Sequence, residues 1–178
     1  PPCRPLAPKE WATTGWQGDR PRAVINSLYL DPVRLQTHNR HLQNKYERMS
    51  VDEIRCAEPD PGEPLDVLLV AYGSSARVSA TGLETLRARG IRADLCRPIS
   101  LFPFPTAAVA RAAARAKAVL VVEMSAGQML EDVRLAVGER RPIHFLGRQG
   151  GILVMPEDVV DAAERILAAP AVREGAGG

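Results

Sequence analysis

The stretch KAVLVVEMSAGQMLEDVRLAV, residues 117–137, decides the fold, because an apolar run, a glycine-containing loop and an amphipathic helix pattern follow one another there. The apolar residues Ala118 to Val122 can lie inside a sheet that is covered on both faces. Ser125 and Gln128 have the spacing of a capping box, which predicts a helix over Gln128–Val137. Polar groups then collect where a parallel strand ends, and open α/β sheets meet ligands and partner subunits at that edge.

The same alternation of strand and helix continues on both sides of this stretch. Strands are predicted at Asp66–Tyr72, Ala93–Arg97, Lys117–Glu123 and Pro142–Leu146, with a short antiparallel edge strand at Ile54–Ala57. Helices are predicted at Ser74–Arg89, Pro105–Arg115, Gln128–Val137 and Pro156–Ala169, the first with an inward stripe of Ala76, Ala80, Leu83 and Leu86. Strands that alternate with helices imply right-handed crossovers and a three-layer α/β/α sandwich.

The N-terminal part has a different composition. Residues 1–25 are rich in Pro, Gly and Trp, and Trp11 and Trp16 suggest an arm that docks on a neighbouring surface. Asp31 and Pro32 can start an amphipathic helix that runs to about residue 49. We therefore expect an arm and helix over 1–50, an α/β domain over 51–170 and a disordered tail over 171–178.

Charge and cysteine content exclude several classes of protein. The chain has 178 residues and a formal net charge of +2, so nothing indicates a nucleic-acid surface. Cys3, Cys56 and Cys96 are an odd number with no close pairing, which favours a reducing compartment and excludes a zinc finger or a cysteine-ligated iron–sulfur cluster. No apolar stretch is long enough for a membrane span, so we expect a soluble cytoplasmic protein.

One candidate anion site lies at the turn after the first long strand. The backbone N–H groups near Gly73 and the hydroxyls of Ser74 and Ser75 could hold an anion, with help from Arg77. The alternative is that Gly73 makes the turn and the serines only cap the helix. Neither GxGxxG nor GK[ST] is present, which disfavours an NAD-type enzyme or a phosphate loop.

No catalytic or metal centre is predicted. His38 and His41 are three residues apart on one helix, but no third ligand is evident, and His144 lies inside a short strand. There is no GxSxG motif, and Cys96 has no nearby base in sequence. The stiff loop that leaves the strand at Arg97, RPISLFPFP, is instead typical of an interface.

Together these motifs resemble a known family. The runs VLLVAYGSSAR, RPISLFPFP, VLVVEMSAGQMLEDVRLAV, HFLGRQGG and MPEDVV resemble the C-terminal part of the alpha subunit of 2-oxoacid:ferredoxin oxidoreductases, most closely the branched-chain 2-oxoisovalerate type. The upstream runs EWATTG, VINSLYLDP and HNRHLQNKYERM are similar to the preceding segment of that subunit. Residues 65–169 more distantly resemble the transketolase C-terminal domain, which implies a mostly parallel five-stranded sheet with one antiparallel edge strand.

The resemblance implies a role in oxidative decarboxylation of a 2-oxoacid to acyl-CoA with reduction of ferredoxin. The complete enzyme would use thiamine diphosphate, Mg, iron–sulfur clusters and CoA. The pyrimidine-binding domain expected before residue 1 is not in this chain, and the diphosphate and cluster domains are expected on a beta subunit and a cluster-bearing subunit. We therefore expect the isolated chain to bind none of these cofactors, to be inactive, and to serve assembly.

The residues expected at the interface or active-site approach are Arg97, Glu123, Gln128 and Arg148, for which positioning of loops is favoured over direct contact with a cofactor. An alternative from another class is a freestanding α/β module that binds a small anion at residues 73–77.

Overall fold

The computed structural model describes residues 18–60 and 62–169, together with 5, 7, 9, 11, 12, 15 and 16. It contains two compact units, Pro1–Lys45 and Tyr46–Gly178. The tail expected to be disordered, 171–178, and Cys3 lie outside the described residues. The predicted domain boundaries therefore stay predictions.

The first unit contains most of the long helix α1 (Pro32–Asp52), which ends three residues later than predicted. Asp31 caps it, because its carboxylate accepts hydrogen bonds from the backbone N–H groups of Val33 at 2.8 Å and Arg34 at 3.4 Å. The ring of His38 stacks on Tyr29 with centroids 4.7 Å apart, as in an aromatic packing contact.

Within the arm, Trp16 lies beneath the Arg22 guanidinium, 4.8 Å from its ring centroid. Its indole N–H donates to the backbone carbonyl of Arg20. The rings of Trp11 and Trp16 are exposed. Docking of this arm on another surface stays a prediction.

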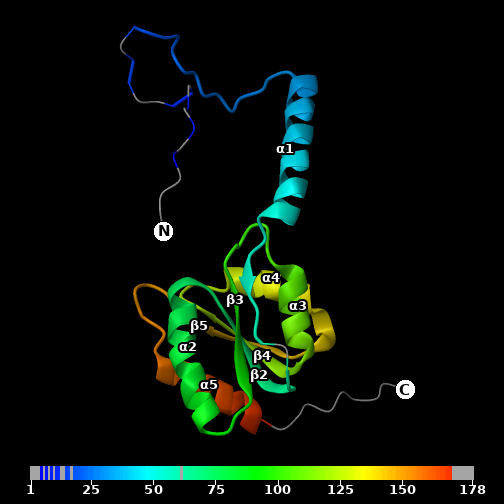
Figure 1. Cartoon of the computed structure of the whole chain (residues 1–178), viewed down its shortest axis with the longest axis vertical. Helices are drawn as coiled ribbons and strands as arrows, with labels where there is room; N and C mark the ends of the chain where they lie inside the picture. Colours follow the sequence, from blue (N-terminus) through cyan, green and yellow to red (C-terminus); the bar gives the residue numbers. More distant parts are fainter. Residues whose placement is uncertain are drawn as a thin grey trace, which may run out of the picture. The chain divides into compact units, whose positions relative to one another are not determined.

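The second unit is a five-stranded sheet with helices on both faces (Figure 1). Its strands are β1 (Cys56–Ala57), β2 (Leu65–Ala71), β3 (Ala93–Pro98), β4 (Ala116–Glu123) and β5 (Ile143–Gly147). Its helices are α2 (Gly73–Ala88), α3 (Thr106–Ala114), α4 (Gln128–Val137) and α5 (Pro156–Ala168), with a short 3₁₀ turn at Gly138–Arg140. The strand order is β1-β3-β2-β4-β5, and β1 runs antiparallel to β3 while the other pairs are parallel.

Two apolar layers hold this unit together, with α2 and α5 on one face and α3 and α4 on the other (Figure 1). Alternate side chains of β2 pack in the two layers, because successive side chains in a strand point to opposite faces. Val67 and Leu69 pack in the layer of α2 and α5, whereas Leu68 and Val70 pack in the layer of α3 and α4. The predicted three-layer sandwich and its antiparallel edge strand are confirmed.

The inward face of α2 differs from the prediction at one position. Ala80 is exposed, and Ser79 and Gly82 are buried instead. A Cβ atom on Gly82 would lie 3.2 Å from the Cβ of Val159, so the glycine lets α5 approach α2 closely. The stripe was misplaced because Ser79 and Gly82 are not apolar side chains, although both are small enough for a helix contact.

Candidate functional site

The candidate site is the edge of the sheet where the parallel strands end. We define this carboxyl edge as residues 72–77, 97–104, 123–128 and 148–155, which comprise the loops after β2, β3, β4 and β5 and, for β3 and β4, the last residues of the strand. β2 and β4 are neighbours in the sheet. The chain continues from β2 into α2 on one face of the sheet and from β4 into α4 on the other face. This is a topological switch point, at which open α/β sheets bind ligands. All the residues predicted for a site lie along this edge.

The side chain of Glu123 lies at the centre of the edge, and none of its surface is exposed. Its Oε2 accepts hydrogen bonds from the Ser125 hydroxyl at 2.7 Å and the Met129 N–H at 3.1 Å. Its Oε1 accepts from the Leu130 N–H at 2.9 Å. Because these two amides belong to the first turn of α4, a carboxylate at the end of β4 caps the next helix and complements its dipole.

The predicted capping box of Ser125 and Gln128 is wrong. The residue before the helix is Gly127, whose φ of +104° is the left-handed conformation that glycine tolerates. Ser125 donates its hydroxyl to Glu123 and does not accept from the helix. The buried carboxylate accepts more strongly than a serine hydroxyl, so the free amides of α4 bond to it.

Arg148 connects the ends of β4 and β5 to α5. Its backbone N–H donates to the carbonyl of Glu123 at 3.2 Å, and its guanidinium donates to Asp158 at 3.2 Å. The backbone N–H of Met155 also donates to Asp158 and, together with Arg148, holds the pKa of that carboxyl below its usual value. The observed bonds of Glu123 and Arg148 are those of residues that hold loops in place.

The other predicted residues lie along the same edge. Gly73 has a φ of +54° at the turn into α2, and Ser74 and Arg77 are exposed, whereas Ser75 is buried. Arg77 has no hydrogen bond or ion pair in the part of the chain that the structure describes. Arg97 and Gln128 are also exposed.

Large apolar side chains are exposed on two loops of the carboxyl edge. They are Ile99, Leu101 and Phe102 after β3 and Ile152, Leu153 and Met155 after β5. The sequence predicts the first loop as an interface and the second only as a glycine-rich connection. Clusters of exposed apolar residues of this kind are typical of surfaces that bind another protein.

The loop after β3 is anchored at its base. The Ile99 N–H donates to the Arg55 carbonyl at 3.0 Å, and the Arg55 N–H donates to the Ser100 hydroxyl at 2.9 Å. The ring of Phe102 meets Tyr46 edge-on with centroids 5.6 Å apart, yet 67% of Phe102 is exposed. The loop therefore presents an apolar surface on a fixed support.

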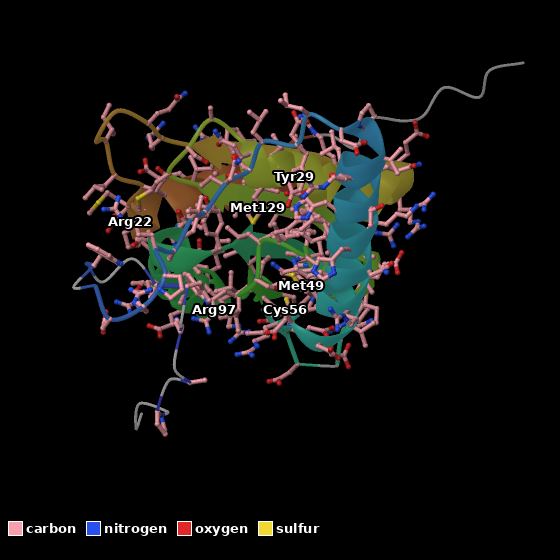
Figure 2. The ribbon with its side chains drawn as sticks, turned by 90° about the horizontal axis from the view of Figure 1, so that it is seen from above. Arg22, Tyr29, Met49, Cys56, Arg97 and Met129 are labelled. Atoms are coloured by element: carbon pink, nitrogen blue, oxygen red, sulfur yellow. The ribbon has the colours of Figure 1, made fainter. Side chains whose placement is uncertain are left out.

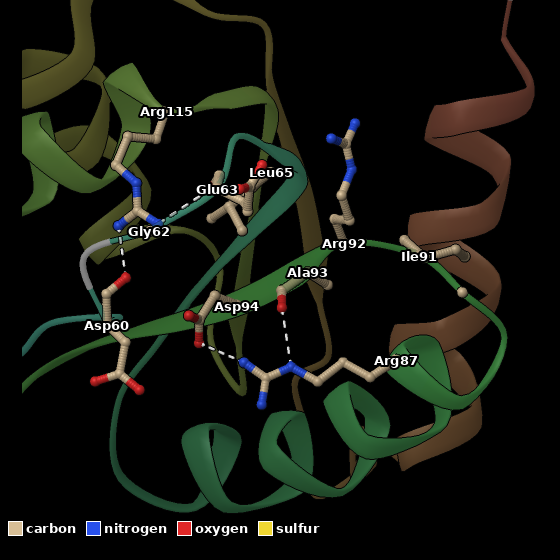
Figure 3. A pocket seen from close by; sticks show the side chains of 11 residues that line it. Asp60, Gly62, Glu63, Leu65, Arg87, Ile91, Arg92, Ala93, Asp94 and Arg115 are labelled. Carbon is tan, nitrogen blue, oxygen red and sulfur yellow. Dashed lines mark hydrogen bonds and ion pairs between the residues drawn. The ribbon is translucent and has the colours of Figure 1, made fainter.

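The opposite amino edge of the sheet is rich in charge and holds an open pocket of about 390 Å³ (Figure 3). Arg87 pairs with Asp94 at 3.0 Å, and Arg115 donates to the backbone carbonyls of Asp60 and Glu63. Figure 3 shows these guanidinium groups turned toward their partners in the protein. Because these guanidinium groups are already bonded within the protein, the pocket has few free hydrogen-bond donors for an anion.

Two thiols that are far apart in sequence are neighbours in the structure. The Sγ atoms of Cys56 and Cys96 are 3.6 Å apart. The residues are 40 apart in sequence, and only the antiparallel pairing of β1 with β3 brings them together.

The described residues do not fit a thiamine diphosphate site by themselves. A metal that clamps the diphosphate needs oxygen ligands, and no group of three or more His, Cys, Asp or Glu side chains in the described part could hold a metal ion. Glu123 is enclosed and already bonded by three donors, so it is not available to a cofactor ring. No helix in the described part is both long and apolar enough to cross a membrane.

Comparison with known proteins identifies similar subunits. The pyruvate:ferredoxin oxidoreductase core domain II family matches residues 65–159. Ketoisovalerate oxidoreductase subunit VorB of Methanothermobacter thermautotrophicus is 38% identical over 88% of this chain and 44% of its own length. 2-Oxoglutarate synthase subunit KorA of Archaeoglobus fulgidus is 37% identical over 55% of this chain and 28% of its own length. The chain thus spans less than half the length of these relatives.

Solved structures share the fold. A 2-oxoglutarate:ferredoxin oxidoreductase from Magnetococcus marinus matches with a TM-score of 0.63 and 22% identity, over 78% of this chain and 24% of that one. A split-gene transketolase in an inactive tetramer matches with a TM-score of 0.54 and 22% identity, over 64% of this chain and 41% of that one. The predicted likeness to the transketolase fold and to 2-oxoacid oxidoreductase subunits is confirmed.

Proposed function

Because the chain belongs to the pyruvate:ferredoxin oxidoreductase core domain II family, we propose that it is the C-terminal domain of the alpha subunit of a 2-oxoacid:ferredoxin oxidoreductase. The complete enzyme would decarboxylate a 2-oxoacid, form an acyl-CoA and reduce ferredoxin. A branched 2-oxoacid is the favoured substrate, in keeping with the named activity of the VorB relative. A cytoplasmic location and residues 1–50 as the joining segment are parts of this proposal.

The chain's own role is assembly, and the observation that carries this is the exposed apolar surface of the carboxyl edge. Phe102 and Ile152 lie on the loops that follow β3 and β5, two strands that β2 and β4 separate in the sheet, and both side chains are mostly exposed. Burial of such side chains stabilises a complex by about 1.5–3 kcal/mol each. The occupant we propose is the remainder of the alpha subunit together with the beta subunit, because the chain spans less than half of its relatives.

The cofactors of the complete enzyme would be held by those partners. Thiamine diphosphate, Mg, the iron–sulfur clusters and CoA would supply carbanion, electron-transfer and acyl-transfer chemistry there. Within this chain, Glu123 and Arg148 keep the loops after β4 and β5 in place. Arg97 and Gln128 lie exposed beside them and would line the approach to the active site.

The test is co-expression of the chain with the missing alpha-subunit domains, the beta subunit and the cluster-bearing subunit. We expect a stable complex on size-exclusion chromatography. The double variant Phe102→Asp/Ile152→Asp should lose it while keeping the circular dichroism spectrum of the native chain. Leu135→Asp is the matched control, because Leu135 is 83% exposed on α4 and lies outside the carboxyl edge. A complex that tolerates the double variant as well as the control would contradict the proposal.

A second candidate is a freestanding module that binds a small anion at residues 73–77. The exposed guanidinium of Arg77, without a partner in the described part, is the observation that favours it. Calorimetry of the isolated chain with phosphate, CoA and thiamine diphosphate separates the two functions. Micromolar binding that Arg77→Ala abolishes and Arg134→Ala preserves would favour the module, and absence of binding would favour the assembly role.

A further inference from the structure

The thiols of Cys56 and Cys96 are close enough to react with each other. Their Sγ atoms are 3.6 Å apart, while a disulfide bond measures about 2.0 Å. Cys56 belongs to the short edge strand β1, which pairs only with β3, so a small movement of this strand would close the gap. Cys96 is fully buried in β3, whereas Cys56 is partly exposed.

The surroundings make the two thiols unequal. The hydrogen bond between the two sulfur atoms, in which either can be the donor, lowers the pKa of Cys56, and the nearby Arg111 and Arg97 guanidinium groups act in the same direction. Burial of Cys56 and the carboxylate of Glu58, which pairs with Arg111 at 2.7 Å, oppose that shift. The same hydrogen bond and deeper burial raise the pKa of Cys96.

This inequality matches the two roles in thiol oxidation. The attacking sulfur must be a thiolate that an oxidant can reach, and the second sulfur must lie close by and stay protected until it is needed. Cys56 has the first set of properties and Cys96 has the second. Register pairs the neighbouring Ala57 with Arg97, and Figure 2 shows Cys56 and Arg97 near each other at this corner of the sheet.

We propose that Cys56 and Cys96 form a peroxide-reactive thiol pair, in which Cys56 is oxidised first and Cys96 then closes a disulfide between β1 and β3. The Cys56 thiolate attacks one oxygen of hydrogen peroxide, the O–O bond breaks, and the leaving hydroxide takes a proton and departs as water. Cys56 is then a sulfenic acid. The Cys96 sulfur attacks the Cys56 sulfur, the S–O bond breaks, and the departing hydroxide takes the Cys96 proton to become a second water.

Two thiols are thus oxidised by two electrons, and one molecule of hydrogen peroxide is reduced to two of water. The new bond would fix the edge strand next to Arg97 and next to the anchored base of the loop after β3. That loop carries Phe102, so oxidation would act at one end of the carboxyl edge.

The experiment uses the 178-residue chain carrying Cys3→Ser, which leaves Cys56 and Cys96 as its cysteines. The folded protein is treated with hydrogen peroxide, unfolded in iodoacetamide and analysed by mass spectrometry. We expect loss of both titratable thiols and a peptide that links Cys56 to Cys96 with the loss of two hydrogens. In the reduced folded chain, iodoacetamide should alkylate Cys56 before Cys96.

Two further variants make the assignment specific. With Cys96→Ser the Cys56 sulfenic acid should persist and be trapped by dimedone, and with Cys56→Ser the remaining thiol should resist peroxide. The proposal is overturned if both thiols survive peroxide in the folded Cys3→Ser chain. It is overturned equally if Cys56 is oxidised to the sulfinic acid without any link to Cys96, or if Cys96 reacts first.

Discussion

The carboxylates at the two edges of the sheet have different partners and different exposure. At the amino edge, Asp66 pairs with Arg92 at 2.9 Å and with Lys117 at 2.8 Å, near the surface. At the carboxyl edge, Glu123 is fully buried and bonded by one hydroxyl and two backbone amides, with no cation among its hydrogen-bond donors. Ion pairs at a surface contribute little to stability, whereas removing one partner of a buried charge is costly.

The two edges also differ in the surface that they present to a partner. The amino edge has its guanidinium groups bonded within the chain, so it is complete as it stands (Figure 3). At the carboxyl edge, Glu123 and Arg148 hold the loops after β4 and β5 in place, and the loops after β3 and β5 expose Phe102 and Ile152. An edge that is rigid and apolar is suited to a partner, and this is the edge at which related folds place their ligands. The predictions below test this difference, from the largest effect to the smallest.

Glu123→Ala should have the largest effect. It leaves two amides of α4 and the Ser125 hydroxyl without their acceptor, so we expect a loss of about 3–5 kcal/mol in the free energy of unfolding. Urea denaturation measures it. Glu131→Gln, on the exposed face of the same helix, should change stability by less than about 0.5 kcal/mol. Equal stability of the two variants would show that the buried carboxylate is not the main support of this edge.

Closure of the Cys56 and Cys96 thiols should stabilise the oxidised chain by about 2–4 kcal/mol, because the bond closes a loop across 40 positions of sequence. Thermal unfolding of the peroxide-treated Cys3→Ser chain should show a higher midpoint than the reduced chain. Adding a reductant should reverse the shift. An unchanged or lower midpoint would mean that the bond strains the corner of the sheet.

Gly147→Ala should destabilise the carboxyl edge by about 1–3 kcal/mol, since a new Cβ atom would crowd the ring of Phe145 and approach the Ser125 carbonyl to 3.0 Å. Gly62→Ala at the amino edge is the matched control. Its Cβ atom would meet nothing nearer than an Arg115 nitrogen at 3.9 Å, so a change below about 0.5 kcal/mol is expected. Urea denaturation of both variants tests whether the two edges differ in packing. Equal losses in the free energy of unfolding would contradict such a difference.

The ion pairs of Asp66 should give a smaller, pH-dependent effect. Hydrogen bonds from Arg92 and Lys117 hold the pKa of Asp66 below its usual value. A lowered pKa in the folded state adds stability above the unfolded value near pH 4, and this stability is lost as the pH falls further. Asp66→Asn should therefore cost about 1 kcal/mol at pH 7 and flatten the decline below pH 4. Calorimetric scans would contradict this prediction if the loss of stability below pH 4 were the same in Asp66→Asn as in the native chain.

Most of the fold could be predicted because β2 and β4 are apolar on both faces. Runs such as Ala118 to Val122 occur in strands covered on both sides, and each helix between them has a clear start and end. The predicted strands agree with the observed ones to within about a residue or two at each end. The face of α2 was less predictable, because Ser79 and Gly82 pack by their small size.

The candidate site was only partly predictable. Its location at the strand ends followed from the alternation of strands and helices, and Glu123 and Arg148 were identified as polar residues there. The bond from Glu123 to the amides of α4 was not foreseen, because Ser125 has the spacing of an ordinary cap. The contact of Cys56 with Cys96 depends on strand register, which one sequence does not reveal.

The most direct test of the central claim is decarboxylation of 2-oxoisovalerate, measured as release of labelled carbon dioxide. The purified chain should release none, even with thiamine diphosphate, Mg and CoA present. The chain co-expressed with its missing domains and partner subunits should release it steadily, with Phe102→Asp/Ile152→Asp lowering the rate by preventing assembly. Sustained release by the purified chain alone would contradict the account.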